Sequence, residues 1–272
     1  MISRLYFPGY PINQFIKSFY YYRDFNPPHS IDRFLPDGNV QLLFELTSDP
    51  KYIYDNTTLA EIQACRKVWF SGIRTKPITI PSGKDSEMIV VEFHKGKAFP
   101  FIKDMMHALT DHVVDAELVL KNNILELREK LIEEKDVDRK LRLLEKNLLD
   151  FYLNSLKENP FVDFVITRIL QTPDQTCLKK LAEKVGYTQK HIIKIFKDHV
   201  GVPPKEFLKI IRFQQALAEI ERHKNISWTT LAIDCGFYDQ SHFIADFKTF
   251  SGFTPQEYIR QKKDNTHYIP VV

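Results

Sequence analysis

Cysteine and glycine are scarce in this chain, and their scarcity argues against several common classes of protein. Among 272 residues there are 3 cysteines and 9 glycines. Cys65, Cys177 and Cys235 lie far apart and show no CxxC spacing, so they suit a reducing compartment better than a disulfide framework or a zinc site. None of the glycines forms a phosphate-binding loop, and no catalytic nucleophile motif is present.

Long apolar runs are also missing. No segment approaches the run of about 18 apolar residues that a membrane span needs, and the N-terminus lacks the apolar stretch of a secretory signal. We therefore expect a cytoplasmic protein with no membrane partner. Hydrophobic residues make up 43% and charged residues 27% of the chain, which is typical of a globular protein long enough for two domains.

Candidate metal ligands do not cluster in the sequence. His94, His107 and His112 fall on different expected elements and lack the His-x-His spacing and partner carboxylate of a metal-binding cupin. Each is more simply explained as a surface or packed histidine. We expect no metal, no cofactor and no enzymatic activity. The alternative is an enzyme whose β domain is catalytic and whose helical domain only targets it, and a test for bound metal would discriminate.

Charge is weakly polarised along the chain. Residues 160–262 contain 15 Lys and Arg against 11 Asp and Glu, a net charge of +4, whereas the whole chain carries +3. A mildly basic C-terminal region permits nucleic-acid binding without requiring it. A sequence-tolerant architectural DNA binder is a further alternative. The modest charge disfavours it, because non-specific binding depends on many phosphate contacts.

Residue patterns divide the chain into four segments. Residues 1–110 predict an antiparallel β-sandwich or small barrel, because short β-rich runs follow one another with turn residues and no helices between them. Residues 111–159 predict a helical connector. Residues 160–262 predict an all-helical domain, and residues 263–272 form a tail. The expected β-rich runs are Gln14–Tyr22, Val40–Leu46, Lys51–Tyr54, Lys67–Ile73, Ile78–Pro81 and Met88–His94.

The connector predicts two amphipathic helices that are broken near Lys135-Asp136. One apolar series has a spacing of seven residues and another has a spacing of three and four. The first is Leu118, Leu125 and Ile132, and the second is Leu141, Leu144, Leu148 and Tyr152. Such helices either pack on the β domain, which we favour slightly, or form a dimer interface. The chain enters the next segment at Asn159-Pro160, because the residue before proline is disfavoured in a helix.

The C-terminal segment contains an internal repeat. The first copy runs from Leu181 to Phe207 and the second from Leu231 to Tyr258. In each copy a short helix ends at a glycine, which can take a positive φ at little cost, and a capping side chain and a second helix follow. These parts are residues 178–185, Gly186 and Thr188 in the first copy, and residues 229–235, Gly236 and Asp239 in the second. Both copies therefore predict a helix-turn-helix unit.

The second helix of each copy is expected to contact DNA. Lys190, Lys194 and Lys197 share one helical face. Recognition helices read bases mainly with their N-terminal residues, which favours Lys190 and Lys194 for base edges and Lys197 for phosphate. Between the copies, Arg212 either contacts phosphate or pairs with an acid inside the domain. The candidate DNA-binding residues are Thr188, Gln189, Lys190, His191, Lys194, Lys197, Arg212, Gln240, Ser241, His242, Ala245 and Lys248.

This ordered signature resembles the DNA-binding domain of the AraC/XylS family of bacterial regulators. The first copy and the helix after it carry Leu181-Ala182-Glu183, Gly186-Tyr187-Thr188, Phe196-Lys197, Gly201-Val202-Pro203-Pro204-Lys205-Glu206-Phe207 and Ile211-Arg212. The second carries Leu231-Ala232, Gly236-Phe237, Asp239-Gln240-Ser241-His242-Phe243, Phe247-Lys248 and Thr254-Pro255-Gln256-Glu257-Tyr258. The resemblance implies contact with two successive major grooves of double-stranded DNA and activation or repression of genes. The family usually has arginine at Ala245, so we expect the first recognition helix to dominate specificity here.

The N-terminal segment resembles the cupin-like β-sandwich sensor domain that often precedes such DNA-binding domains. The features are the aromatic run from Phe15 to Tyr22, Pro36-Asp37-Gly38 before a strand, and Phe70-Ser71-Gly72-Ile73 before Pro77. The resemblance implies an effector, a homodimer, or both, and RNA polymerase as a further partner. It assigns no effector and no effector-binding residues.

Overall fold

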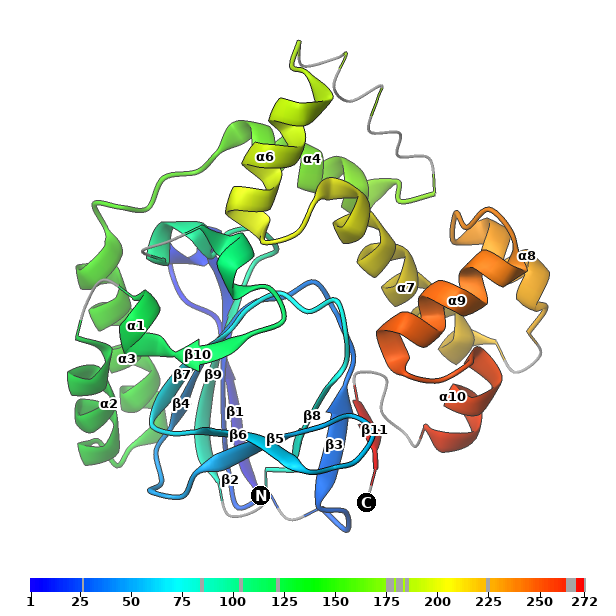
Figure 1. Ribbon diagram of the computed structural model, residues 1–272. Helices are drawn as coiled ribbons and strands as arrows, with labels where there is room; N and C mark the ends of the chain where they lie inside the picture. Colours follow the sequence, from blue (N-terminus) through cyan, green and yellow to red (C-terminus); the bar gives the residue numbers. More distant parts are fainter. Residues whose placement is uncertain are drawn as a thin grey trace.

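A β-rich domain and a helical domain lie against each other in the computed structural model, joined by a helical connector (Figure 1). The described residues are 1–272 apart from 26, 84–85, 103–104, 121–122, 175–178, 180–182, 184–185, 224–225, 263–267 and 272. Cys177 and most of the helix expected at residues 178–185 lie outside the described residues. The expected fold class, an antiparallel β domain followed by helices, is confirmed.

Two antiparallel sheets form the β domain. Neighbouring strands in the first sheet are, in order, β1 (Ile2–Tyr6), β2 (Ile16–Arg23), β9 (Glu87–Phe93), β4 (Gln41–Glu45), β7 (Val68–Ser71) and β10 (Val113–Asp115). Those in the second are β11 (Tyr268–Pro270), β3 (Ile31–Phe34), β8 (Ile78–Pro81), β5 (Lys51–Tyr54) and β6 (Glu61–Cys65). Three short 3-10 helices lie between these strands: η1 (Ile12–Gln14) between β1 and β2, and η2 (Phe99–Phe101) and η3 (Met106–Leu109) between β9 and β10. Because β10 pairs with β7, the first sheet continues past residue 110, where we expected the connector to begin.

The connector consists of α1 (Ala116–Val119), α2 (Ile124–Glu133) and α3 (Val137–Tyr152). The expected break is confirmed: Asp136 caps α3 by accepting a hydrogen bond from the backbone amide of Arg139 at 2.8 Å. Leu141, Leu144 and Leu148 are buried in the same core as the first sheet, so the helices pack within the chain. The expected seven-residue seam is wrong at its first position, because Leu118 lies on α1 and is 66% exposed.

The helical domain contains α4 (Pro160–Gln171), α6 (Gln189–Val200), α7 (Pro204–Arg222), α8 (Trp228–Asp234), α9 (Gln240–Ser251) and α10 (Pro255–Gln261). The side chain of Asn159 caps α4, and proline occupies its first turn, as the Asn-Pro boundary predicts. In Figure 1, α6 lies above the β domain and α9 lies beside it, at opposite ends of the long helix α7. Within the described residues, no helix is both long and apolar enough to cross a membrane.

The C-terminal tail returns to the β domain. Strand β11 pairs antiparallel with β3, with Tyr268 opposite Phe34, and their rings lie 5.3 Å apart. The backbone amide of Val271 also donates to the carbonyl oxygen of Ile31 at 2.9 Å. The sequence analysis assigned no structure to this tail. A single hydrophobic cluster runs from the first sheet through the connector into α7 and α9, so the two domains share one core.

Candidate nucleic-acid interface

The first recognition helix, α6, is fixed by signals that are local in the sequence. The Thr188 hydroxyl accepts a hydrogen bond from the backbone amide of His191 at 3.3 Å, and Gly201 ends the helix with φ +105°. Both fulfil the expected capping roles. Ile192, Phe196 and Val200 are buried. Because buried residues recur on one side of the helix, the opposite side is left exposed.

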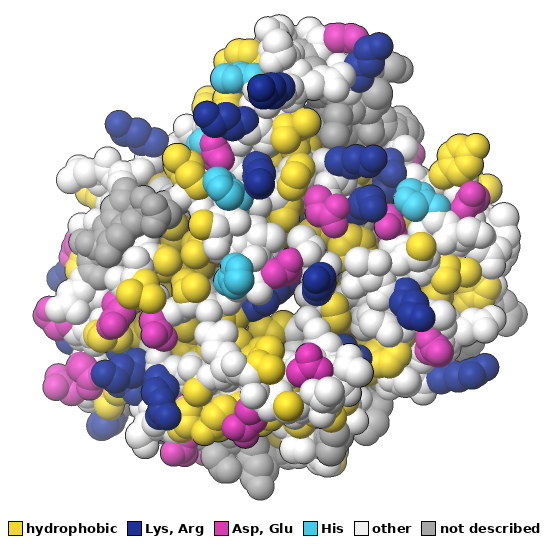
Figure 2. All heavy atoms as spheres, in the orientation of Figure 1, with side chains coloured by type: hydrophobic (Ala, Val, Ile, Leu, Met, Phe, Trp, Pro, Cys, Tyr) yellow, Lys and Arg dark blue, Asp and Glu magenta, His cyan; other side chains and the backbone are white. Residues whose placement is uncertain are grey.

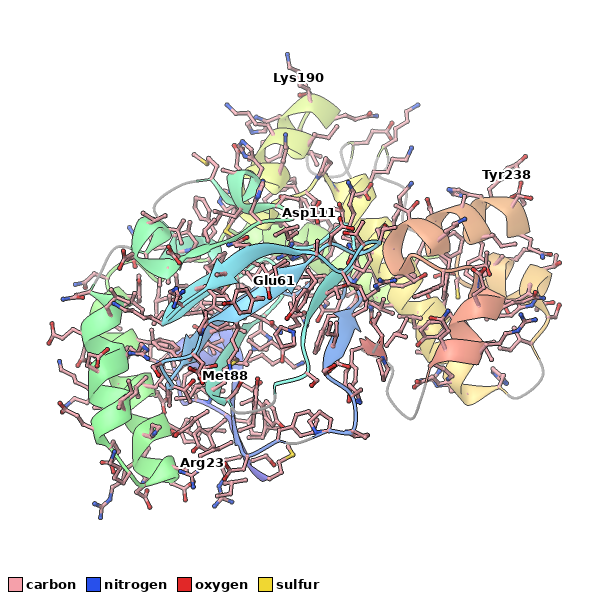
Figure 3. All side chains as sticks on the ribbon, turned by 60° about the horizontal axis from the view of Figure 1, so that its bottom comes forward. Arg23, Glu61, Met88, Asp111, Lys190 and Tyr238 are labelled. Atoms are coloured by element: carbon pink, nitrogen blue, oxygen red, sulfur yellow. The ribbon has the colours of Figure 1, made fainter. Side chains whose placement is uncertain are left out.

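The exposed side of α6 is basic. Lys190, Lys194 and Lys197 are all exposed, and among the described residues none forms a hydrogen bond or ion pair with their side chains. Figure 2 shows Lys and Arg side chains gathered over the upper lobe that contains α6, and in Figure 3 Lys190 points away from the body of the protein. Gln189 and His191 are exposed next to them. This face offers cationic donors to a phosphate backbone or to base edges.

Tyr187 is a surface residue that the sequence analysis did not select. It is 45% exposed, and its ring lies edge-on to His191 at 4.8 Å and to Phe161 at 5.2 Å. Its position between Gly186 and the cap Thr188 could have indicated it, because residues that enter a recognition helix lie close to the DNA backbone.

The second recognition helix, α9, repeats this framework. The Asp239 carboxylate accepts from the backbone amide of His242 at 2.7 Å, and Gly252 ends the helix in the left-handed region. Phe243, Phe247 and Phe250 are buried, as expected. On the other side Ser241, Ala245 and Lys248 are exposed, and Gln240 is half-buried and accepts from the Thr229 hydroxyl at 2.8 Å.

Asp246, which the sequence places beside Ala245, turns inward. Its carboxylate lies 3.0 Å from Lys209 Nζ on α7 and 3.3 Å from His242 Nε2, and its side chain is 13% exposed. The His242 side chain is therefore partly exposed and also lies beside the internal carboxylate of Asp246. The acid contributes to the packing of α9 on α7, and the exposed face of α9 carries little charge of either sign.

Arg212 lies between the two units and is half-buried. Its Nε donates to the carbonyl oxygen of Pro173 at 2.9 Å. Burial lowers the pKa of its guanidinium, and the nearby Asp174 and Asp246 carboxylates oppose that shift. The hydrogen bond that Arg212 forms thus goes to a backbone carbonyl rather than to an acid, and its contact with phosphate stays a prediction.

Two family profiles match the chain. One, described as a helix-turn-helix domain, matches residues 181–261 and so spans both units. The C-terminal domain is of the AraC/XylS type. The other profile, described as a domain of unknown function (DUF6597), matches residues 4–115, which cover the first sheet from β1 to β10.

Two curated relatives each match part of the chain. The HTH-type transcriptional activator RhaS of Escherichia fergusonii is 32% identical over 84 residues, 31% of this chain and 30% of that protein. An uncharacterized HTH-type transcriptional regulator of Haemophilus influenzae is 26% identical over 116 residues, 42% of this chain and 39% of that protein. The chain thus spans about a third of the length of these curated relatives. Among solved structures, ToxT from Vibrio cholerae aligns with 89% of this chain and 96% of its own at 12% identity, with a TM-score of 0.43.

The first unit of the AraC-type domain is held against the β domain at the end of α6. The Thr110 hydroxyl, just after η3, donates to the carbonyl oxygen of Gly201 at 2.7 Å. His107 Nδ1 lies 3.2 Å from the Asp198 carboxylate. A Cβ added to Gly201 would lie 2.7 Å from Ile73 Cγ2. The carboxyl end of α6 is therefore buried against the β domain, while Thr188 and Gln189 at its amino end are exposed.

The second unit reaches the β domain through other contacts. Gln214 on α7 donates to the carbonyl oxygen of Pro36 at 2.7 Å, and the Arg33 guanidinium lies 5.1 Å from the centre of the Phe253 ring. The turn at Pro36-Asp37-Gly38, expected from the sequence, thus serves as a docking point for α7. None of the described residues forms a cluster of three or more His, Cys, Asp or Glu that could hold a metal ion.

Proposed function

We propose that this protein is a cytoplasmic, one-component transcription regulator that binds DNA in a sequence-specific manner. In this proposal α6 and α9 enter two successive major-groove segments, about 34 Å apart along the duplex. Base contacts come from the amino ends of these helices, through Gln189, Lys190, His191 and Lys194 in α6 and Gln240, Ser241, His242 and Ala245 in α9. Thr188, Lys197 and Lys248 contact phosphate, and RNA polymerase is the further partner.

The observation that carries the proposal is the repeated unit itself. Two helices with matching caps and terminal glycines, α6 and α9, flank the long helix α7, and α6 exposes three lysines whose side chains no described residue engages. A solvated helix surface with no DNA partner explains one such unit, but it does not explain two in this arrangement. The names of the relatives, a transcriptional activator and a transcriptional regulator, agree with this function.

The β domain is the proposed sensor. Its two sheets enclose a cavity of about 430 Å³, within the range of about 300–1,000 Å³ that small-molecule sites occupy. An effector bound there would shift the arrangement of the AraC-type domain and thus its occupancy of promoter sites. Dimerisation through the β domain or the connector is the second route by which this domain could act.

Selection of randomised duplex DNA on the purified full-length protein at physiological salt tests the proposal. We expect two enriched sequence blocks whose centres lie about 10 base pairs apart. One enriched block would support regulation with a single reading helix. If nothing is enriched, with or without cell extract as a source of effector, the regulator function is wrong. Binding that is equal on all sequences and falls steeply with salt would favour the architectural alternative.

A further inference from the structure

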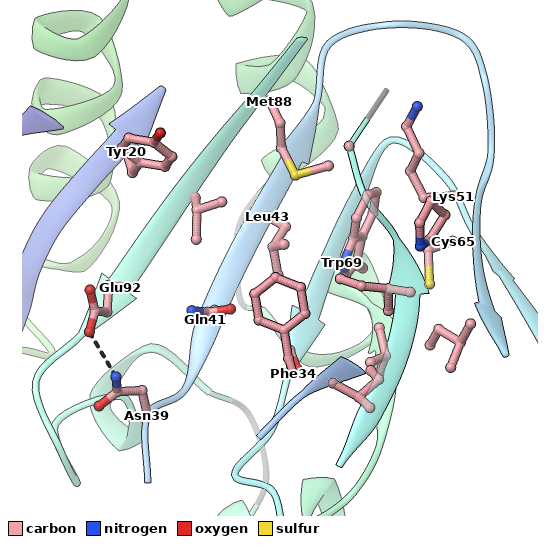
Figure 4. Close-up of a pocket in the computed structure, with 18 of the residues that line it drawn as sticks. Tyr20, Phe34, Asn39, Gln41, Leu43, Lys51, Cys65, Trp69, Met88 and Glu92 are labelled. Atoms are coloured by element: carbon pink, nitrogen blue, oxygen red, sulfur yellow. Dashed lines mark hydrogen bonds between the residues drawn. The ribbon is translucent and has the colours of Figure 1, made fainter. Parts of the chain in front are cut away.

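The cavity in the β domain is apolar along most of its wall and polar in a few places. Aromatic side chains contribute much of the lining, namely Tyr20, Tyr22, Phe34, Tyr52 and Trp69. Figure 4 shows Leu43, Trp69 and Met88 directed into the same space, with Asn39 and Glu92 toward one end and Lys51 and Cys65 toward the other. A wall of this kind fits a compound with an apolar body and a small number of polar groups.

Most charged groups that line the cavity are already paired. Glu92 accepts from Asn39 Nδ2 at 2.8 Å and lies 3.0 Å from Lys17 Nζ. Lys51 Nζ lies 3.6 Å from the Glu45 carboxylate. Asp37 accepts from the backbone amide and side chain of Asn39. The protein therefore balances these charges by itself, and they do not require a ligand.

Arg74 is the exception. Arg74 is one of the residues that line the cavity, and its Nη1 donates to the carbonyl oxygen of Asp111 at 2.7 Å. Its Nε and Nη2 are buried and have no hydrogen-bond partner, and none of the described residues forms a carboxylate ion pair with it. Burial lowers the pKa of Arg74, and the charges of Asp111 and Cys65 oppose that shift. Two buried donors without acceptors cost about 1–3 kcal/mol each, so an incoming acceptor would be favoured.

Nε and Nη2 form one edge of a planar guanidinium, and two parallel N–H bonds on one edge match the two oxygens of a carboxylate. We propose that the cavity binds an apolar carboxylic acid whose carboxylate is held by Nε and Nη2 of Arg74. This proposal rests on the proposed function, because it names the class of effector that the sensor domain takes.

Arg74 lies two hydrogen bonds away from α6. Asp111, whose carbonyl oxygen accepts from Arg74, follows Thr110, whose hydroxyl donates to Gly201 at the end of α6. Asp111 has φ +61°, and its carboxylate accepts from the backbone amide of Thr75 at 2.7 Å. A turn constrained in this way would shift as a unit if a carboxylate drew Arg74 toward the cavity. The acid is therefore expected to change the affinity of α6 for DNA.

Calorimetry with three acids and their matched alcohols tests the ligand class: 2-naphthoate, 4-phenylbutanoate and decanoate against 2-naphthylmethanol, 4-phenylbutanol and decanol. We expect at least one acid to bind more tightly than its alcohol by about 10-fold or more. Fluorescence of Trp69 in a Trp228→Phe background, which leaves one tryptophan, places the bound acid in the cavity. If no acid binds, or if acids and alcohols bind equally, the proposal is wrong. Tighter binding of 2-naphthyl phosphate than of 2-naphthoate would overturn it in favour of a phosphate ligand.

Substitutions of Arg74 test the geometry. Arg74→Gln should weaken binding of the acid about 10- to 100-fold and leave the alcohol within about twofold. Arg74→Lys keeps the charge and loses the two-donor edge, so it should weaken the acid by about 5-fold or more, and it carries the test if Arg74→Gln does not fold. Ser86→Ala removes another buried, unpartnered group of the cavity wall and should leave the preference for acid unchanged. A preference for acid that survives both Arg74 substitutions would overturn the assignment.

DNA affinity measured with and without saturating acid tests the link to α6. We expect a change of about 5-fold or more in the wild type. In Thr110→Val, which loses the hydroxyl that donates to Gly201, we expect acid binding within about twofold of wild type and no effect of the acid on DNA affinity. An unchanged effect in this variant would overturn the link. Acid binding without any selected DNA would contradict the proposed function alone, and selected DNA without acid binding would contradict the ligand alone.

Discussion

The two helix-turn-helix units share a framework and differ in what they expose. Both recognition helices begin at a capping side chain, Thr188 in α6 and Asp239 in α9, and both end at a glycine with positive φ. α6 exposes three lysines whose side chains no described residue engages, whereas the matching positions of α9 expose Ser241, Ala245 and one lysine, Lys248, and Asp246 turns toward α7.

This difference separates the residues that build the framework from those that would read DNA. Caps, terminal glycines and buried phenylalanines recur in both copies because each helix must begin, end and pack in the same way. The outward side is under no such constraint. It can be basic in one unit and nearly neutral in the other without any change in the fold, so the two units can differ in their share of DNA recognition.

The largest effect that we predict concerns the attachment of the first unit to the β domain. In Gly201→Ala, the new Cβ would lie 2.7 Å from Ile73 Cγ2 and 3.1 Å from Thr110 Oγ1, at a residue with φ +105°. We expect the free energy of unfolding to fall by about 3 kcal/mol, from backbone strain and overpacking together. Thermal or urea unfolding measures the change.

Gly186→Ala is the matched control for Gly201→Ala. Gly186 also has a positive φ, +70°, but a Cβ there would meet no atom of the described residues within 4 Å. We therefore expect only the cost of the backbone conformation, about 1 kcal/mol. Equal losses in the two variants would mean that the residues around Gly201 give way to the added methyl group at no cost, so that α6 is not tightly packed against the β domain there.

The second prediction concerns DNA recognition by α6 and α9. Lys194→Ala should weaken binding to a selected site by about 1–3 kcal/mol, because it removes a donor to a base edge. Ala245→Arg should tighten binding, because it places a strong donor on the exposed face of α9. Titration of labelled duplexes measures both changes. Small and equal effects would contradict the idea that the first helix dominates specificity.

Much of this framework could be predicted from the sequence, because its signals are local. Thr188 and Asp239 were identified as caps from the glycine before each and the helical pattern after each, and both accept the expected backbone amide. The strands around the centre of the first sheet were also predicted, since buried runs such as β4 and β9 carry apolar residues on both sides.

The strands that were missed depend on partners elsewhere in the chain. β1 and most of β6 are exposed, so their own residues show no buried pattern and only pairing with β2 and β5 makes them strands. β3 buries Asp32 and Arg33, which read as loop residues in isolation. β11 is a strand because β3 lies beside it. Arg74 was missed for the same reason: its unpaired donors follow from the burial of its neighbourhood.

The third prediction compares the two caps. Thr188→Ala and Asp239→Ala each remove a hydrogen bond to a backbone amide at the start of a recognition helix, and each should lower the free energy of unfolding by about 1 kcal/mol. Here the two units should respond alike, since the caps belong to the shared framework. Thr188→Ser and Asp239→Asn keep an acceptor oxygen and should recover most of the loss. A cap that costs nothing on removal would indicate a helix whose amino end is already frayed.

The smallest effect should come from the lysines at matching positions near the ends of the two helices. Lys197 and Lys248 are both exposed and lie one helical turn before the terminal glycines. If each contacts phosphate, its replacement by alanine should weaken binding to all sequences alike and reduce the slope of log affinity against log salt by about 1. The affinity is measured between low and physiological salt on a selected and an unrelated duplex. If Lys197→Ala and Lys248→Ala each reduce this slope by the same amount, both helices lie on the DNA backbone, even if only α6 reads bases. A slope change in Lys197→Ala alone would mean that α9 stays off the duplex, and the difference between the units would then extend from base recognition to binding itself.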